Sequence, residues 1–206
     1  MERSLCAPTK AKQSMNAVSP QQPQHQDPFE ILGLEPSFRL EPKLLEKRHR
    51  DLSRALHPDR YAGRPALERR RALNQAIGVN EAFRVLRDPV RRASALLERY
   101  GVETSEQAAN STAMPPEFLM EMMQLREELS AARQQRRVAA IEGLAKQTRE
   151  RQQQVVETIA TEFDEISGSL PVANSQRLER LRGQIATLRF LRRLMEEIEV
   201  SYDELL

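Results

Sequence analysis

The sequence predicts an all-α protein, in which an N-terminal helical hairpin precedes a C-terminal antiparallel three-helix bundle. Aromatic residues make up 4% of the 206 residues, tryptophan is absent and glycine occurs 7 times, while charged residues reach 30%. That composition is typical of helices with narrow apolar seams and broad solvated faces. Apolar residues also recur at spacings of three, four and seven along several long segments, which is the periodicity of a helix face.

Charge and cysteine content exclude several classes of protein. Thirty-two basic and thirty acidic side chains leave a formal net charge of +2, so bulk attraction to nucleic acid is not expected. The single cysteine, Cys6, cannot form an intramolecular disulfide and indicates a reducing compartment. No apolar run has the length of a membrane span. We therefore expect a cytoplasmic protein with no cofactor, no metal site, no membrane contact and no nucleic-acid partner.

Changes in composition divide the chain into four segments. Residues 1–26 are rich in Gln, Pro, Ser and Ala and lack apolar periodicity, which predicts a disordered tail. Residues 27–100 contain the hairpin. Residues 101–115 carry turn-forming residues and two adjacent prolines, and we expect a linker there. Residues 116–206 contain the bundle.

Two helix-start signals open the hairpin. Asp27-Pro28 is an N-cap residue followed by proline at the first helical position, and it begins the short segment DPFEILGL. Glu41-Pro42 begins the next helix, which we expect to end near Leu56, where a proline follows two residues later.

That second helix carries two stripes about half a turn apart. The packing stripe comprises Leu45, His49, Leu52 and Leu56. The basic stripe comprises Lys43, Lys47, Arg50 and Arg54. A row of charges is usually just a solvated surface. The acidic residues of this helix lie off the basic stripe, however, which favours a surface that meets a partner.

The helix after the hairpin loop should run from about Pro65 to Arg87. Its expected inner face carries Leu73, Ala76, Ile77, Asn80 and Phe83. Pro89 should end or kink this helix, and a further helical piece, VRRASALLERYG, should close at Gly101.

Three amphipathic segments predict the bundle. The first, EFLMEMMQLREELSAA, places Phe118, Met122, Leu125 and Leu129 on one seam. The second should run from about Val138 to Ile166, with Ile141, Ala145, Thr148, Val155, Ile159 and Phe163 inward. The third should run from about Gln176 to Leu205, with Leu181, Ile185, Leu188, Met195 and Tyr202 inward.

His57-Pro58-Asp59 begins the hairpin loop. Pro58 removes a backbone donor and pushes His57 out of the helical region, so an imidazole and a carboxylate project together from an exposed tip. The tripeptide makes a poor catalytic site, because no serine, cysteine or metal ligand completes it and no pocket excludes water. It could also simply end the helix, since Asp and Pro are common in turns.

In this context the chain resembles the J-domain family, co-chaperones that stimulate ATP hydrolysis by DnaK-class chaperones. The segments DPFEILGL, HPDR and VNEAFRVLRDPVRRA occur in the family's order between residues 27 and 93. By that resemblance, His57, Pro58 and Asp59 form the contact that is indispensable for stimulating the partner ATPase. The resemblance also implies that the basic stripe meets an acidic surface of the chaperone.

The C-terminal half narrows the resemblance. No Gly/Phe-rich segment and no zinc-binding cysteine repeat is present, whereas FLMEMMQLREEL and LRFLRRL resemble the bundle of the HscB (Hsc20) family of iron–sulfur-cluster co-chaperones. This resemblance covers residues 27–206. It implies delivery of the cluster scaffold IscU to the chaperone HscA and stimulation of the HscA ATPase, with no enzymatic activity of the chain's own.

Three features bear on how far that resemblance carries. His49 stands where the family usually has an aromatic residue, which touches the packing of the hairpin. Ala131 stands where an acidic residue helps to hold the scaffold. The N-terminal cysteine pairs of some eukaryotic relatives are absent, which favours a bacterial, cytoplasmic form.

The first helix of the bundle carries more apolar residues than its seam requires, which suggests a binding patch. The predicted scaffold-binding residues are Leu119, Met120, Met123, Gln124, Arg126, Glu127 and, from the last helix, Phe190. Phe190 is expected roughly opposite the inward stripe of its helix. The alternative is that these side chains pack against the N-terminal domain or a neighbouring helix.

Two other functions stay open on the sequence alone. A J-domain co-chaperone with an unrelated client would share residues 27–100 but should lack FLMEMMQLREEL. A helical scaffold or nucleic-acid-binding protein would use the basic stripe as a phosphate contact, but the near-zero net charge argues against it.

Overall fold

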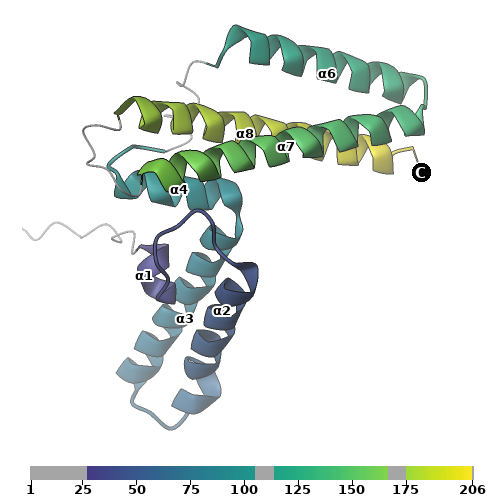
Figure 1. Ribbon diagram of the computed structural model, residues 1–206. Helices are drawn as coiled ribbons and strands as arrows, with labels where there is room; N and C mark the ends of the chain where they lie inside the picture. The colour runs from purple at the N-terminus through teal and green to yellow at the C-terminus, as the bar shows by residue number, and fades with distance from the viewer. Residues whose placement is uncertain (1–26, 105–113, 167–174, 206) are drawn as a thin grey trace, which may run out of the picture.

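The computed structural model describes residues 27–104, 114–166 and 175–205. The elements in chain order are α1 (Pro28–Leu32), α2 (Pro42–Ala55), the 3₁₀ turn η1 (Pro58–Tyr61), α3 (Ala66–Arg87), α4 (Pro89–Arg99), α6 (Pro116–Gln134), α7 (Val138–Ile166) and α8 (Ser175–Asp203) (Figure 1). These ranges contain no strand, which confirms the predicted all-α class. The tail expected at residues 1–26 and most of the expected linker lie outside the described residues.

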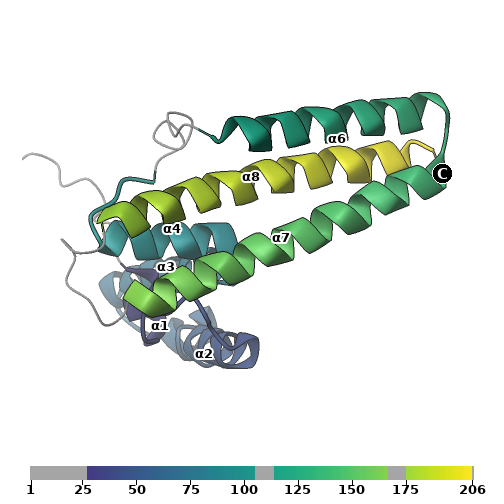
Figure 2. The same cartoon turned by 45° about the horizontal axis from the view of Figure 1, so that its top comes forward.

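The helices form two units that meet at α4. Figure 1 shows the α2–α3 hairpin projecting away from the long α7–α8 pair, with α4 between them and α6 on the far side of that pair. In Figure 2, α6, α7 and α8 run alongside one another and extend beyond α4. None of the described helices combines the length and the apolarity needed to cross a bilayer.

The hairpin unit is built around α1. Asp27 caps α1 by accepting a hydrogen bond from the Phe29 amide (2.9 Å), and Phe29 and Leu32 are fully buried against the hairpin. Gly33 ends the helix in the left-handed region (φ 61°), where glycine carries no Cβ penalty.

His49 joins α2 to α3 from a half-buried position. Its Nε2 donates a hydrogen bond to Asn80 Oδ1 (2.9 Å), and its ring stacks on Phe83 with centroids 4.1 Å apart. The prediction that His49 belongs to the packing stripe is therefore confirmed, because its ring packs on Phe83 while its Nε2 is hydrogen-bonded.

The predicted inner face of α3 is partly wrong. Leu73 and Ile77 are exposed, and the core positions are Ala72, Val79, Ala82 and Leu86. The predicted face is centred about a third of a turn from the buried one, and Ala76 and Phe83 at its edge are partly buried. Two of the four buried positions are alanines, and small residues contribute little to a pattern based on hydrophobicity.

Asp88 connects the hairpin unit to the bundle. Its Oδ1 accepts hydrogen bonds from the amides of Val90 (2.8 Å) and Arg91 (3.0 Å), which caps α4, and from Arg192 Nη2 of α8 (2.7 Å). Burial acts to raise the pKa of Asp88, but these hydrogen bonds and the Arg192 charge outweigh it and hold the pKa below its ordinary value.

The segment between α1 and α2 also packs on the bundle. Phe38 stacks on Phe163 of α7 (centroids 5.7 Å apart), and Arg92 lies over the Phe38 ring at 4.9 Å. Arg39 hydrogen-bonds both Glu157 and Asp164, and these bonds raise the pKa of Arg39 and lower that of Glu157. Aromatic packing and ion pairs therefore hold the two units together.

The bundle runs up, down and up again. All of the seam residues predicted on α6 and α7 are buried, as are Leu181, Ile185, Leu188 and Met195 of α8, whereas Tyr202 is partly buried. Phe118 meets Phe190, Arg126 meets Glu197 and Arg133 meets Glu204. The residue numbers advance together in these pairs, so α6 and α8 are parallel and each is antiparallel to α7.

Replacement of Asp88 tests the connection between the units. Asp88→Ala should lower the free energy of unfolding by about 1–2 kcal/mol, because the cap of α4 is lost. Asp88→Asn should cost less, since Asn is an equally good N-cap that removes only the charge facing Arg192. Urea denaturation of the full chain at neutral pH measures both changes.

The same carboxylate gives a pH dependence with a defined sign. Because folding lowers the pKa of Asp88, its charged form stabilises the protein at neutral pH, and this stabilisation is lost as the pH falls through about 4 and below. The stability difference between the wild type and Asp88→Asn should therefore shrink in acid. A constant difference from pH 7 to pH 3 would show that the Asp88 charge contributes nothing.

Candidate functional site

The hairpin tip presents His57 and Asp59 together. Both side chains are exposed, and their Nδ1 and Oδ2 atoms lie 3.4 Å apart. The Asp59 amide donates to His57 Nδ1 (3.3 Å), so His57 caps the 3₁₀ turn that Pro58 begins. In the neutral imidazole this leaves the proton on Nε2, directed to solvent. The tip therefore offers a hydrogen-bond donor and a carboxylate in a fixed local geometry.

The basic stripe of α2 is largely free of internal partners. Within the described residues, no acid lies at ion-pair distance from Lys43, Lys47 or Arg54, and Arg50 has only Glu46 at 3.6 Å. Glu46 thus reaches the edge of the stripe, which the sequence interpretation had placed clear of acids. All four cations are exposed and only Arg50 has an acid at ion-pair distance among the described residues, so the stripe is a largely uncompensated positive surface next to the tip.

The outer face of α6 carries apolar side chains that the core does not use. Leu119, Met120 and Met123 are exposed, with Met123 at 63%, and they lie opposite the buried seam. Gln124 and Glu127 are exposed at the edge of this face, and Glu127 has no ion-pair partner among the described residues. The alternative of packing on a neighbouring element is therefore wrong for the three apolar residues.

Two of the predicted scaffold-binding residues are engaged with the bundle itself. Phe190 is partly buried and meets Phe118 edge-to-face, with centroids 6.2 Å apart, so it does not point away from the core as expected. The reason is that α8 contacts α4, α6 and α7, and the contact with α6 covers Phe190. Arg126 pairs with Glu197 of α8 (2.8 Å), which neutralises this cation at the edge of the apolar face.

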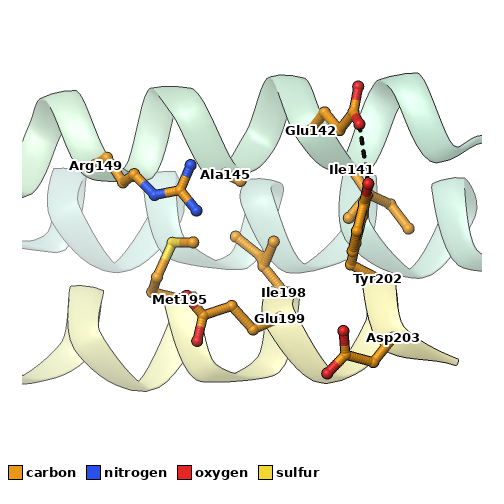
Figure 3. Close-up of a pocket in the computed structure, with 9 residues that line it drawn as sticks. All are labelled: Ile141, Glu142, Ala145, Arg149, Met195, Ile198, Glu199, Tyr202 and Asp203. Carbon is orange, nitrogen blue, oxygen red and sulfur yellow. Dashed lines mark hydrogen bonds between the residues drawn. The ribbon is translucent and has the colours of Figure 1, made fainter.

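A shallow groove of about 280 Å³ lies between the C-terminal half of α8 and the start of α7 (Figure 3). Its apolar lining includes Ile141 and Met195, and Tyr202 donates a hydrogen bond across it to Glu142 (3.2 Å), which raises the pKa of Tyr202. The described residues that line it include no serine, cysteine or histidine, so it offers no nucleophile and base. Nor do the described residues hold any cluster of three possible metal ligands.

The two predicted sites lie at opposite ends of the molecule. The hairpin tip is the part of the hairpin most distant from the bundle in Figure 1, and α6 lies on the far side of α7 and α8. Sequence analysis missed the residues between them, Asp88, Arg192 and Arg39. Only Asp88 had a signal, because Asp88-Pro89 repeats the capping pattern of Asp27-Pro28.

The sequence is similar to a known family and to proteins of described function. The family described as "HSCB C-terminal oligomerisation domain" matches residues 114–199. The co-chaperone protein HscB homolog of Azoarcus sp. (strain BH72) is 36% identical over 180 residues, which is 87% of this chain and 96% of that protein. The HscB homolog of Bordetella pertussis is 42% identical over 137 residues, or 66% of this chain and 79% of that one.

Solved structures give the same result. The chaperone HscB from Vibrio cholerae superposes with a TM-score of 0.71 at 31% identity, covering 88% of this chain and all of that one. The human co-chaperone protein HscB superposes with a TM-score of 0.74 over 94% of this chain and 93% of that one, and at 22% identity it supports the fold alone.

Two adjacent methionines of α6 separate the core from the outer face. Met122 is 4% exposed and Met123 63%. Met122→Ala should lower the free energy of unfolding by about 2 kcal/mol or more, because it leaves a cavity in the seam. Met123→Ala should change it by less than about 0.5 kcal/mol. Thermal and urea denaturation of the two variants compare them, and equal losses would mean that α6 is rotated about its axis from this position.

Proposed function

Because this chain belongs to the HscB family of co-chaperones, we propose that it binds an IscU-type iron–sulfur cluster scaffold and delivers it to a DnaK- or HscA-class chaperone. In doing so it stimulates the ATPase of that chaperone and supports the maturation of iron–sulfur proteins in the cytoplasm. The observation that carries the proposal is the presence of two exposed surfaces of different chemistry at opposite ends of one connected structure. Neither surface is a catalytic site, and the chain acts through binding.

The hairpin tip is assigned to the chaperone. Pro58 fixes the backbone at the end of α2, so little conformational freedom is lost when His57 and Asp59 are bound. The Asp59 carboxylate is suited to a charge-assisted hydrogen bond with a cation of the chaperone. The basic stripe beside it attracts an acidic surface from a distance and orients the approach.

The outer face of α6 is assigned to the scaffold. Methionine side chains are flexible and polarisable, and they adapt to irregular apolar surfaces. Leu119 and Met123 are one turn apart on this face, and the polar Gln124 and Glu127 flank it, an arrangement typical of an apolar contact centre with a polar rim. Phe190 lies on the buried side of α6, where it contacts Phe118 of the seam.

Substitution at the tip tests the chaperone assignment. Asp59→Asn and His57→Gln should abolish stimulation of the ATPase of a purified HscA-class chaperone. Both side chains are exposed, so the free energy of unfolding should change by less than about half a kcal/mol. Steady-state ATP hydrolysis with increasing co-chaperone measures the effect. Full stimulation by the Asp59→Asn variant would contradict the assignment of this tip to the chaperone.

Substitution on α6 tests the scaffold assignment. Leu119→Ala and Met123→Ala should each weaken binding of a purified IscU-type scaffold roughly tenfold, as truncation at the centre of an interface typically does. Basal stimulation of the chaperone should survive, while the additional stimulation produced by the scaffold should disappear. Calorimetric titration of the scaffold measures the first effect.

The matched control is Leu44→Ala, because Leu44 of α2 and Leu119 have the same exposed fraction, 42%. It should leave scaffold binding unchanged. Phe190→Ala is a weaker test, since loss of its contact with Phe118 should lower stability as well as affinity. If both α6 variants bind the scaffold as the wild type does, while the tip variants lose stimulation as expected, the protein is a J-domain co-chaperone with an unrelated client.

A further inference from the structure

The hairpin carries an apolar pair, Leu73 and Ile77, that its own fold does not use. The two side chains are 55% and 58% exposed. They are four residues apart on α3 and therefore lie on one face of the helix, one turn above the other. That face points away from the core residues Ala72, Val79 and Ala82, so the pair is not a frayed edge of the hydrophobic core.

The apolar pair lies on the same side of the hairpin as the basic stripe. Around the axis of α2, the residues that follow the buried face on the His49 side are Ser53 and then Arg50. Around the axis of α3, the residues that follow the buried face on the Asn80 side are Leu73 and then Ile77. Since His49 and Asn80 contact each other, both sets of residues lie on the side opposite α1.

The pair is also level with the cations nearest the tip. The two helices are antiparallel and His49 is opposite Asn80, so Leu73 lies level with the last turn of α2 and Ile77 level with Ser53. Arg50 and Arg54 occupy these same turns of α2. The basic stripe and the apolar pair therefore make one continuous surface that begins at the hairpin tip.

Further cations lie on the tip side of the pair, and Glu81, one turn after it, is paired with Arg84 (2.7 Å). Arg69 and Arg70 lie one turn before Leu73, both exposed, and neither has an acid within ion-pair distance in the part of the chain that the structure describes. An exposed apolar centre with an uncompensated positive rim fits a partner surface that is apolar at its centre and acidic at its edge.

We propose that Leu73 and Ile77 form the apolar centre of the surface on which the ATPase chaperone docks. This inference rests on the proposed function and extends it, because it adds α3 to the tip and the basic stripe. The cations accelerate encounter and the apolar pair slows dissociation, since buried apolar area is insensitive to ionic screening. The chaperone must then present an apolar contact beside its acidic surface.

Other occupants fit this surface less well. A symmetric dimer through the apolar pair would place Arg69 and Arg70 of one copy near the same residues of the other, and like charges at an interface cost several kcal/mol. A nucleic acid would use the cations but would leave two aliphatic side chains against phosphates, without aromatic stacking to compensate. A protein partner of acidic and apolar character satisfies both features.

The test is a full-length double variant, Leu73→Gln with Ile77→Gln, titrated into a purified HscA-class chaperone while ATP hydrolysis is followed. Glutamine is a good helix former and both positions are exposed, so helicity should be retained. The concentration for half-maximal stimulation should rise roughly tenfold, with the maximum unchanged because the tip is intact. The ratio to wild type should persist at high salt, whereas the effect of Arg50→Glu should diminish.

The matched control is Leu67→Gln, because Leu67 is 61% exposed on the same helix but lies on a different face. It should leave the titration unchanged. An unchanged titration for the double variant, with Asp59→Asn inactive, would overturn the inference and leave the proposed function standing. Full stimulation by Asp59→Asn would overturn both. A wild-type dimer that the double variant converts to a monomer, without a change in stimulation, would reassign the surface to self-association and also overturn the inference.

Discussion

The carboxylate of Asp88 is the point through which the two units of this protein are joined. One oxygen caps α4, which continues the hairpin, and also accepts a hydrogen bond from Arg192 of α8. A cap fixes the direction of a helix at its first turn, so the ion pair orients α4 on the bundle rather than merely attaching it. The Phe38–Phe163 stack and the Arg39 ion pairs hold a second, separate segment of the hairpin unit to α7. Two attachment points prevent rotation that one would allow.

This junction places the proposed partner surfaces. The hairpin extends from α4 on one side of α7 and α8, and α6 covers the other side (Figures 1 and 2). Partners bound to the tip and to α6 would therefore not collide at their contacts. The order of the bundle helices contributes to this separation. The chain reverses direction after α6 and again after α7, so α8 lies parallel to α6 and the outer face of α6 stays exposed. The long α7–α8 pair makes most of the contacts within the bundle, while α6 contributes little beyond its seam.

The sequence predicted most of this fold because its signals are local. Pro28, Pro42 and Pro89 mark helix starts, and the bundle seams repeat at helical spacing, so helix bounds and nearly all seam residues are as expected. The failures come from tertiary contacts. Leu73 and Ile77 have the size of core residues, but the smaller Ala72 and Ala82 are buried instead. The prediction of an outward Phe190 fails because no pattern within α8 shows that α6 packs on that side of it through Phe118. The tip and the α6 face were found through resemblance and surplus hydrophobicity, whereas no local pattern could pair Asp88 with Arg192, 104 residues away.

The two exposed apolar surfaces have similar centres and opposite rims, and this difference can sort their partners. On α6, Arg126 is neutralised by Glu197, and the charged side chains without an ion-pair partner among the described residues of this helix include the acids Glu117, Glu127 and Glu128. On the hairpin, the cations without an ion-pair partner near Leu73 and Ile77 include Arg69 and Arg70, with the basic stripe on the neighbouring helix. Aliphatic and methionine side chains alone discriminate weakly between apolar ligands, since their attraction is non-directional. An acidic chaperone surface, however, would be repelled at the rim of α6 and attracted at the hairpin. Specificity then comes from the wrong partner's electrostatic cost as much as from the right partner's contacts, and one small helical protein can hold two proteins without confusing them.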